Sequence, residues 1–243
     1  MNISNITSNH LRHKAFAKRL CDILSIKTVV CESKKRSTKQ FHEKEKDYYK
    51  EVEEWSPYNR FVVCAEGAVN GEVIEDILKK DKLDYLFIFG CSLLKKNIFS
   101  IPKKGCINIH TGLVQSFRGV DSSLWAIYEE KPEAIGATIH FVNNSIDGGN
   151  IIAQSRTELD MEDDLHDIFF KTCNTGFQLL EEKVFDILAG RTRQKKLTKK
   201  GKLYQKKDLT KQVVEEVVQK TPDVIRKYLQ NKEKIDLGLR LIK

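Results

Sequence analysis

The sequence predicts an α/β protein with a mostly parallel sheet flanked by helices, followed by a short C-terminal extension. Residues 2–31 have a strand, helix, strand order, which is typical of a parallel sheet. Residues 83–94 form a nearly continuous apolar run, as expected of a strand covered on both faces. After residue 160, apolar residues recur at helical spacing. A chain of 243 residues is long enough to bury a substantial core.

The composition is that of a globular protein, with 40% apolar residues. No window approaches eighteen uninterrupted apolar residues, and the N-terminus lacks the basic-then-apolar layout of a signal peptide. The six cysteines are irregularly spaced and include no CxxC motif, which favours reduced core thiols over disulfides or zinc ligands. We therefore expect a cytoplasmic protein with no membrane association.

The first half of the chain contains the pattern of a parallel sheet. We expect a strand over 2–8, a helix over 10–24 and a second strand over 28–31. No glycine-rich loop joins the first strand to its helix, so the dinucleotide fingerprint and the P-loop are both absent. The highly charged segment 32–58 is typical of a surface helix. A third strand at 61–64 and a helix at 73–78 follow.

The apolar run 83–94 includes a glycine where the strand is expected to end. In an open α/β sheet, ligands gather at the carboxyl ends of the strands. An ordinary strand-to-loop transition would explain the same residues equally well. The candidate residues for a pocket rim here are Gly90, Cys91, Ser92, Leu93 and Leu94.

The second half contains further strands and two long helices. A helix around 124–128 can be capped by Asp121 or Ser122, and a long amphipathic helix is expected to begin at Asp160 and to end at Gly190. The remaining elements are strands over 107–110, 137–141 and 151–154, a short segment over 202–204 and a helix over 210–230. We expect residues 1–190 to form the main domain and residues 191–243 a basic connector with a helical extension.

The net charge of +8 is concentrated in residues 191–207, which hold nine lysines and arginines and no acidic residue. Such a run can contact phosphate groups or nucleic acid. Only one aromatic residue, Tyr204, interrupts it, which favours a solvated connector. We therefore expect no nucleic-acid partner.

Three polar residues stand out between 105 and 149. Asn108 and His110 alternate with isoleucines, so on a strand their side chains share one face. Asp147 follows in a turn that ends in two glycines. An amide, an imidazole and a carboxylate suffice for acyl transfer to an amine: the amide and the protonated imidazole can stabilise the oxyanion, and the carboxylate can assist proton transfer.

Two other interpretations of these residues remain open. His110, His140 and Asp147 make up a two-histidine, one-carboxylate set that could bind a metal ion. No HExxH motif is present and Asn108 has no strong place in such a site, so we predict no metal. Alternatively, the same residues satisfy a sheet edge and cap a turn.

A set of motifs in this region resembles the folate-dependent formyltransferase family, and most closely its short sugar N-formyltransferases. The resemblance is close over residues 84–156. The motifs are INIH at 107–110, FRG at 117–119, WAI at 125–127, GATIH at 136–140 and IDGGNII at 146–152. This resemblance implies a Rossmann-like fold.

The resemblance also implies roles for individual residues. Asn108, His110 and Asp147 correspond to the catalytic residues of the family, and the formyl donor would be 10-formyltetrahydrofolate. The residues expected to bind this cosubstrate are Gly90, Cys91, Ser92, Leu93, Leu94, His140, Val142 and Ile146.

Departures from the family pattern bear on the acceptor. Residues 112–115 lack the family's proline, and residues 8–12 lack the glycine- and serine-rich loop that binds the phosphate of glycinamide ribonucleotide. The tail after Gly190 is too short for the barrel domain of the methionyl-tRNA enzymes. The implied acceptor is a small molecule, a nucleotide-linked amino sugar such as a dTDP-4-amino-4,6-dideoxy sugar of lipopolysaccharide O-antigen biosynthesis.

From their chemistry, four residues are candidates for binding this acceptor: Arg12, Phe117, Arg118 and Trp125. The alternatives are a glycinamide ribonucleotide-type formyltransferase and a non-catalytic nucleic-acid-binding protein on the same scaffold. The charged segment 32–58 and the C-terminal helix could each mediate a homodimer.

Overall fold

The computed structural model describes residues 1–35, 38–238 and 241–242, which fall into two compact units. The first unit comprises Met1–Asn108 and Phe141–Ser145. The second comprises Ile109–His140 and Ile146–Lys243. The division lies within two strands, β5 (Gly105–His110) and β7 (Gly136–Phe141), so each of these strands contributes to both units.

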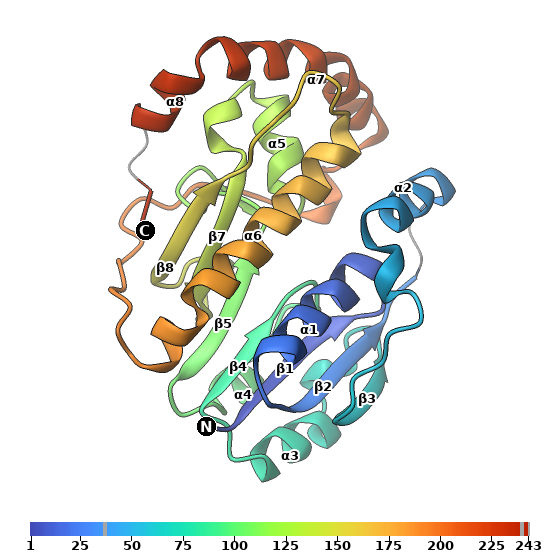
Figure 1. Ribbon diagram of the computed structural model, residues 1–243, viewed down its shortest axis with the longest axis vertical. Coiled ribbons are helices and arrows are strands. Elements are labelled where there is room, and N and C mark those ends of the chain that lie inside the picture. Colours follow the sequence, from blue (N-terminus) through green and yellow to red (C-terminus); the bar gives the residue numbers. More distant parts are fainter. Residues whose placement is uncertain (36–37, 239–240, 243) are drawn as a thin grey trace. The chain divides into compact units, whose positions relative to one another are not determined.

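The first unit is a parallel sheet with helices on both faces (Figure 1). Its strands lie in the order β3-β2-β1-β4-β5, and every neighbouring pair is parallel. This arrangement confirms the predicted α/β class. The strands are β1 (Ile3–Ser8), β2 (Ile26–Ser33), β3 (Arg60–Ala65), β4 (Tyr85–Ile88) and β5; the helices are α1 (Leu11–Ile23), α2 (Lys39–Tyr49), α3 (Glu72–Lys80) and α4 (Lys96–Phe99), with 3₁₀ turns at Lys50–Val52 and Ala68–Asn70.

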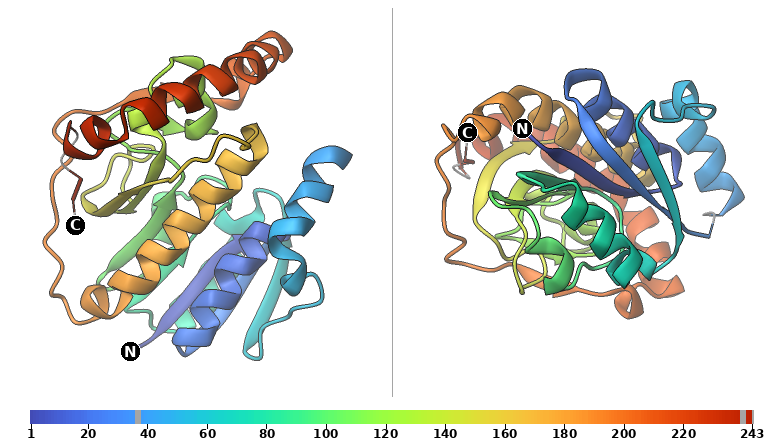
Figure 2. Two further views of the ribbon diagram at one scale, coloured as in Figure 1. Left: turned by 45° about the horizontal axis from the view of Figure 1, so that its top comes forward. Right: turned by 90° about the horizontal axis from the view of Figure 1, so that it is seen from below.

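The central strands are buried on both faces, which explains the apolar sequence of β4. All residues of β1 and β4 are buried. Helices α3 and α4 pack on one face, where Ile6, Leu86 and Ile88 of the strands meet Leu78 and Ile98 of the helices. Helix α1 contacts β1 and β2 from the other face, and Figure 2 shows it on the side of the strands away from α3.

Strand β4 is shorter than the apolar run predicts. Pairing ends at Ile88, shortly before Gly90, where the strand is expected to end, although the apolar run continues to residue 94. The chain turns at Gly90, whose φ of 69° lies in the left-handed region. A side chain there would also collide with the ring of His13, so both conformation and space require glycine. The prediction that the strand ends at Gly90 is close, while residues 91–94 form a loop.

The second unit is built around the end of β5, the antiparallel pair β7–β8 and a long helix. Helix α6 packs against β8, and the close approach of Gly176 to Ile109 and Ala137 leaves no room for a side chain at that position. A second sheet joins β6 and β9 in parallel. The elements are β6 (Phe117–Gly119), α5 (Ser122–Tyr128), β7, β8 (Ile151–Arg156), α6 (Leu165–Leu188), β9 (Lys202–Tyr204), α7 (Lys211–Gln230) and α8 (Lys232–Gly238), with 3₁₀ turns at Pro132–Ala134 and Lys206–Asp208.

Helix α6 begins later than predicted. The sequence favours a start at Asp160, but the cap is Asp164, whose side chain accepts hydrogen bonds from the backbone amides of His166 and Asp167. Asp160 instead pairs with Lys171 at 2.5 Å. Aspartate is a common helix cap, so either Asp160 or Asp164 could fill this position. In the structure the side chain of Asp160 is engaged with Lys171.

The C-terminal residues pack within the second unit. The backbone of Lys195 pairs with that of Ile151, Leu197 is buried, and the ring of Tyr204 stacks on Trp125 at 3.7 Å between ring centres. The basic run therefore lies along this unit as an extended connector. The predicted functional boundary at residue 190 stays a prediction. Within the described ranges, the chain contains no helix that is both long and apolar enough to cross a membrane.

Candidate active site

Strand β5 carries Asn108 and His110. Asn108 pairs with Ile88 of β4 and is the last residue of this strand in the first unit. His110 ends the strand in the second unit, and its side chain is 5% exposed. Since the two residues are two positions apart on one strand, their side chains project from the same face, as the sequence predicts.

Asp147 lies in the turn between β7 and β8, with a left-handed φ of 45° that aspartate tolerates better than most residues. The turn is held from β6. The Gly119 amide donates to Oδ2 of Asp147 at 2.8 Å, and Nη1 of Arg118 donates to the carbonyl oxygen of Ile146 at 2.8 Å. These two contacts orient the carboxylate of Asp147.

Within the second unit, Asp147 lies between two buried histidines. Nδ1 of His110 is 3.4 Å from Oδ2 of Asp147, and Nε2 of His140 is 3.4 Å from Oδ1. Three residues predicted from the sequence are therefore brought together by the fold. Over residues 1–35, 38–238 and 241–242, no group of three or more histidine, cysteine, aspartate or glutamate side chains is arranged to hold a metal ion.

The second ring nitrogen of His110 has its own partners. Nε2 lies 3.2 Å from the carbonyl oxygen of Phe117 and 3.0 Å from Oγ of Ser122. A carbonyl oxygen can only accept a hydrogen bond, so this contact favours the tautomer with the proton on Nε2. The lone pair of a neutral His110 is then on Nδ1, and a proton gained there would lie against the carboxylate of Asp147.

Burial and charge act in opposite directions on this pair. Burial lowers the pKa of His110 below its ordinary value of 6.5, while the negative charge of Asp147 opposes that shift. Burial would raise the pKa of Asp147, but the positive charge on His110, the contacts with His140 and the Gly119 amide outweigh it and hold that pKa well below its ordinary range. At neutral pH the arrangement is a carboxylate beside a neutral imidazole.

The loop after β5 is shaped by the space around His110. A side chain at Gly112 would come within 2.4 Å of Cβ of Ser122 and 2.8 Å of Nε2 of His110. The loop is also held by Thr138, whose hydroxyl donates to the Gly112 carbonyl at 2.7 Å. Where the chain lacks the family's proline, packing and hydrogen bonds fix the loop.

Ser122 and Gly119 are the residues that sequence reasoning missed. Ser122 was identified only as a possible helix cap, yet it is fully buried with its hydroxyl at His110. Gly119 contributes through its backbone amide, which no side-chain pattern reveals. The FRG motif at 117–119 was the available signal, because its three residues each contact this site through backbone or side-chain groups.

The loop expected to bind the cosubstrate lies in the first unit and is positioned by Glu32. This carboxylate is fully buried and accepts hydrogen bonds from the amides of Gly67 at 2.7 Å and Ser92 at 2.5 Å. Leu93 is 69% exposed at the loop's outer side. Leu94 belongs to the hydrophobic cluster that includes Ile6 and Leu86, and Cys91 and Val142 pack against this cluster.

The predicted acceptor-binding residues already have partners within their own units. The guanidinium of Arg12 pairs with the buried Glu45, and that of Arg118 donates to the carbonyls of Gly201 and Ile146. Phe117 and Trp125 are buried in the core of the second unit. The structure thus gives these side chains structural contacts, and their contact with an acceptor stays a prediction.

The chain is similar in sequence to known formyltransferases. A family model described as formyl transferase matches residues 4–184. The chain is 32% identical over 116 residues to a methionyl-tRNA formyltransferase from Kosmotoga olearia, covering 47% of this chain and 37% of that enzyme. The chain thus spans little more than a third of the length of this relative.

Two solved structures share the fold. The sugar N-formyltransferase from a Shewanella species superimposes with a TM-score of 0.65 at 17% identity, over 90% of this chain and 87% of that one. An N-formyltransferase from Helicobacter canadensis, described as a complex with folinic acid and dTDP-3-aminofucose, gives a TM-score of 0.60 at 16% identity, over 86% of this chain and 72% of that one. At these identities the likeness is one of fold.

Proposed function

Because the chain belongs to the formyl transferase family, we propose that it is a folate-dependent formyltransferase acting on the amine of a nucleotide-linked amino sugar. The observation that carries the proposal is the buried pair of His110 and Asp147, with Asn108 on the same face of β5. The folinic acid and the dTDP-linked aminosugar bound by the Helicobacter canadensis enzyme support this choice of donor and acceptor.

The loop at Gly90 suits a folate by its chemistry. Leu93 offers exposed apolar surface, and the neighbouring Leu94 belongs to a hydrophobic cluster against which Val142 also packs. The carboxylate of Glu32 accepts a hydrogen bond from the backbone amide of Ser92 and so fixes the backbone of the loop. A flat heterocycle needs such a mixture of apolar walls and fixed backbone donors and acceptors. The donor 10-formyltetrahydrofolate would supply the formyl group.

His110 is the residue that moves a proton in this proposal. As the neutral amine attacks, Nδ1 of His110 accepts the amine's proton, because Nε2 already donates to the Phe117 carbonyl. The imidazolium so formed is stabilised by Asp147 at 3.4 Å. The proposed reaction thus begins with a neutral His110, because burial favours the neutral ring, and the protonated ring expected from the sequence forms only during the reaction.

Asn108 and Asp147 complete the proposed chemistry. The side-chain amide of Asn108 donates a hydrogen bond to the carbonyl oxygen as negative charge develops on it. Asp147 stays ionised throughout, because its pKa lies well below the ordinary range. It can therefore hold the imidazolium and then help pass the proton to the departing nitrogen.

Rate measurements and calorimetry on the full chain test the proposal. We expect folinic acid to bind and a dTDP-linked 3- or 4-amino sugar to be formylated, with no loss of rate in the presence of a chelator. Preferred turnover of glycinamide ribonucleotide would establish the rival acceptor. Salt-sensitive binding of RNA or DNA together with no affinity for folinic acid would overturn the enzyme assignment in favour of nucleic-acid binding.

The expected homodimer and cytoplasmic location are part of the same proposal. Helix α2 and the C-terminal helices supply the surfaces that we predict for a dimer, and residues 36–37 of the charged segment before α2 lie outside the described residues. Light scattering after gel filtration distinguishes a dimer from a monomer.

A further inference from the structure

Strand β6 contacts the pair of His110 and Asp147 through three successive residues. The carbonyl oxygen of Phe117 lies 3.2 Å from Nε2 of His110, and the Gly119 amide donates to Oδ2 of Asp147 at 2.8 Å. Between them, Nη1 of Arg118 donates at 2.8 Å to the carbonyl oxygen of the residue before Asp147. All of these residues belong to the second unit. The position of β6 therefore sets how Asp147 lies against His110.

The turn at Asp147 needs support from outside itself. Asp147 has a φ of 45°, in the left-handed region that residues other than glycine adopt at a cost. Such conformations persist where the surrounding contacts hold them. The hydrogen bonds from β6 are contacts of this kind, so a displacement of β6 would let Asp147 move away from Nδ1 of His110.

Strand β6 is in turn held by residues 201–204 of the C-terminal connector. It pairs in parallel with β9, and Arg118 lies opposite Leu203. Two strands of three residues each form a sheet that is too small to be stable alone. Backbone hydrogen bonds extend the pairing, from the amide of Gly201 to the Val114 carbonyl at 2.9 Å, from Lys202 to Ser116 at 3.0 Å, and from Val120 to Tyr204 at 3.1 Å.

Two glycines let these segments approach closely. A side chain at Gly201 would collide with the backbone of Ser116 and Phe117. Gly119 has a φ of 90°, and a side chain there would collide with the carbonyl oxygen of Tyr204. Glycine is thus required on both segments, because each packs directly against the backbone of the other.

Side chains anchor β9 to the core of the second unit. The buried ring of Tyr204 stacks on Trp125, and its hydroxyl donates to the carboxylate of Glu129 at 2.5 Å. Nζ of Lys202 donates to the same carboxylate at 2.7 Å. The exposed lysine contributes little, whereas the stacked rings bury a large apolar area. Residues 201–204 are therefore a fixed support for β6.

Arg118 joins this support to the turn at Asp147. Its Nε donates to the Gly201 carbonyl at 3.0 Å, while Nη1 donates to the carbonyl that precedes Asp147. We propose that Arg118 is a positioning residue, which together with residues 201–204 of the connector holds Asp147 in place beside His110. The planar guanidinium fixes both carbonyls at once, which the single nitrogen of a lysine cannot do. The inference rests on the proposed function, because that function assigns the proton transfer to His110.

Arg118→Lys and Gly201→Ala test the proposal by two routes. Arg118→Lys keeps the positive charge but loses one of the two carbonyl contacts, and Gly201→Ala pushes β9 away from β6 without changing any charge. We expect kcat to fall roughly 10–100-fold in both variants, with KM for donor and acceptor little changed, because the reacting groups are misplaced. Arg193→Lys, at an exposed position of the same connector, is the matched control and should keep full activity. A raised KM for the acceptor with an unchanged kcat in Arg118→Lys would assign this side chain to the acceptor and overturn the inference.

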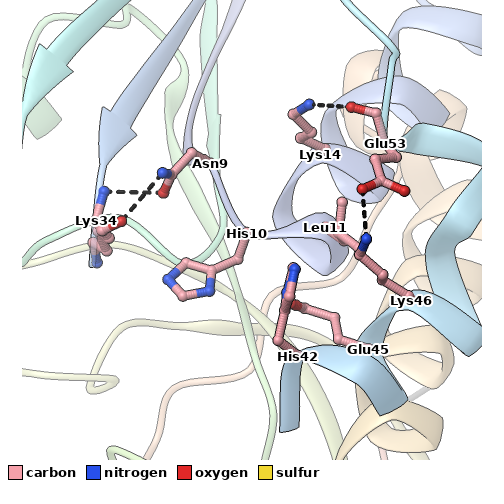
Figure 3. A pocket seen from close by; sticks show the side chains of 9 residues that line it. All are labelled: Asn9, His10, Leu11, Lys14, Lys34, His42, Glu45, Lys46 and Glu53. Carbon is pink, nitrogen blue, oxygen red and sulfur yellow. Dashed lines mark hydrogen bonds and ion pairs between the residues drawn. The ribbon is translucent and has the colours of Figure 1, made fainter. Parts of the chain in front are cut away.

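An NMR titration of the histidine rings reports the position of Asp147 independently of turnover. Burial lowers the pKa of His110, and the negative charge of Asp147 opposes that shift. Displacing Asp147 should therefore lower the pKa of His110 further in both variants, towards its value in Asp147→Asn, in which the negative charge is lost completely. His10, which lines a cavity in the first unit (Figure 3) and whose pKa burial lowers to about 4, is the internal reference and should titrate as in the wild type.

A pKa of His110 that is unchanged or raised in the folded variants would overturn the inference, and Arg118→Lys alone decides the question if Gly201→Ala does not fold. A chain that transfers no formyl group, but in which the variants lower the pKa of His110, keeps Arg118 as a positioning residue and contradicts the proposed function. A chain that formylates an amino sugar, but in which Arg118→Lys changes neither kcat nor the pKa of His110, keeps the proposed function and contradicts the role of Arg118.

Discussion

Nδ1 of His110 and Oδ2 of Asp147 lie 3.4 Å apart, with the two side chains 5% and 12% exposed. The imidazole is held neutral by burial, and the carboxylate is held ionised by the contacts around it. A proton that binds to His110 is therefore stabilised by the negative charge of Asp147 in a buried site. This pair is the basis of the first two predictions.

Replacing His110 by glutamine should lower turnover about 10²–10⁴-fold, because the group that accepts the amine's proton is lost. Initial rates at saturating donor and acceptor measure the effect. Lys199→Ala, in the exposed connector, is the control and should retain full activity. A folded His110→Gln enzyme with a rate near that of the wild type would contradict the role of this histidine.

The acidic limb of kcat/KM should lie below pH 6.5, because His110 must be neutral to act and burial lowers its pKa below that value. Asp147→Asn removes a negative charge that raises the pKa of His110. The limb should therefore move to lower pH as kcat falls. A pH–rate profile of both proteins checks the sign, and a shift to higher pH would contradict it.

Two adjacent buried serines provide a matched pair of variants. Oγ of Ser122 is 3.0 Å from Nε2 of His110, whereas Oγ of Ser123 is buried with no hydrogen-bond partner in the part of the chain that is described. Ser122→Ala should reduce kcat about tenfold, because the imidazole ring of His110 loses a contact that orients it, and KM should change little. Ser123→Ala should be close to neutral. Equal effects of the two substitutions would show that the Ser122 contact is not used.

Glu32→Gln should loosen the loop expected to bind folate. The carboxylate accepts two backbone amides, from Gly67 and Ser92, and a glutamine has only one acceptor oxygen to offer. We expect KM for the donor to rise about tenfold, kcat to stay near that of the wild type, and stability to fall by about 1–3 kcal/mol.

Steady-state kinetics and urea unfolding measure these effects. Glu66→Gln, at an exposed position beside Gly67, is the control. An unchanged KM in a destabilised Glu32→Gln protein would assign Glu32 a purely structural role.

His10 should make the first unit less stable in acid. Its pKa is about 4 in the folded chain and 6.5 ordinarily, so between these values the unfolded chain holds more protons. The free energy of unfolding should fall as pH drops from 6.5 towards 4, by less than about 1.4 kcal/mol per pH unit for this partly exposed ring. His10→Gln should flatten that dependence in urea unfolding, and an unchanged slope would contradict the assignment.

Much of the fold follows from local patterns. The buried residues of β4 match the apolar run from which this strand was predicted, and α7 begins after Thr210, close to its predicted start. Boundaries were less predictable where several residues could serve the same purpose. By residue type Asp160 and Asp164 can both cap α6, and in the structure Asp164 caps it while Asp160 pairs with Lys171.

The predicted site residues differ in what the sequence could show about their contacts. His110, His140 and Asp147 lie together in the structure. Arg12 and Arg118 contact Glu45 and backbone carbonyls, and their predicted contact with an acceptor stays a prediction. A guanidinium has many potential partners in the sequence. Which of them it meets depends on the packing of segments far apart in the chain.

By itself, the sequence determined the properties that arise from neighbouring residues. The two-residue period of a strand places Asn108 and His110 on one face wherever β5 lies. The tertiary structure alone decided what His110 meets there: Asp147, the Phe117 carbonyl and the Ser122 hydroxyl all come from other segments. Strand periodicity is a local consequence of backbone geometry, but hydrogen bonds between distant segments form only when burial brings them together and removes the competing water.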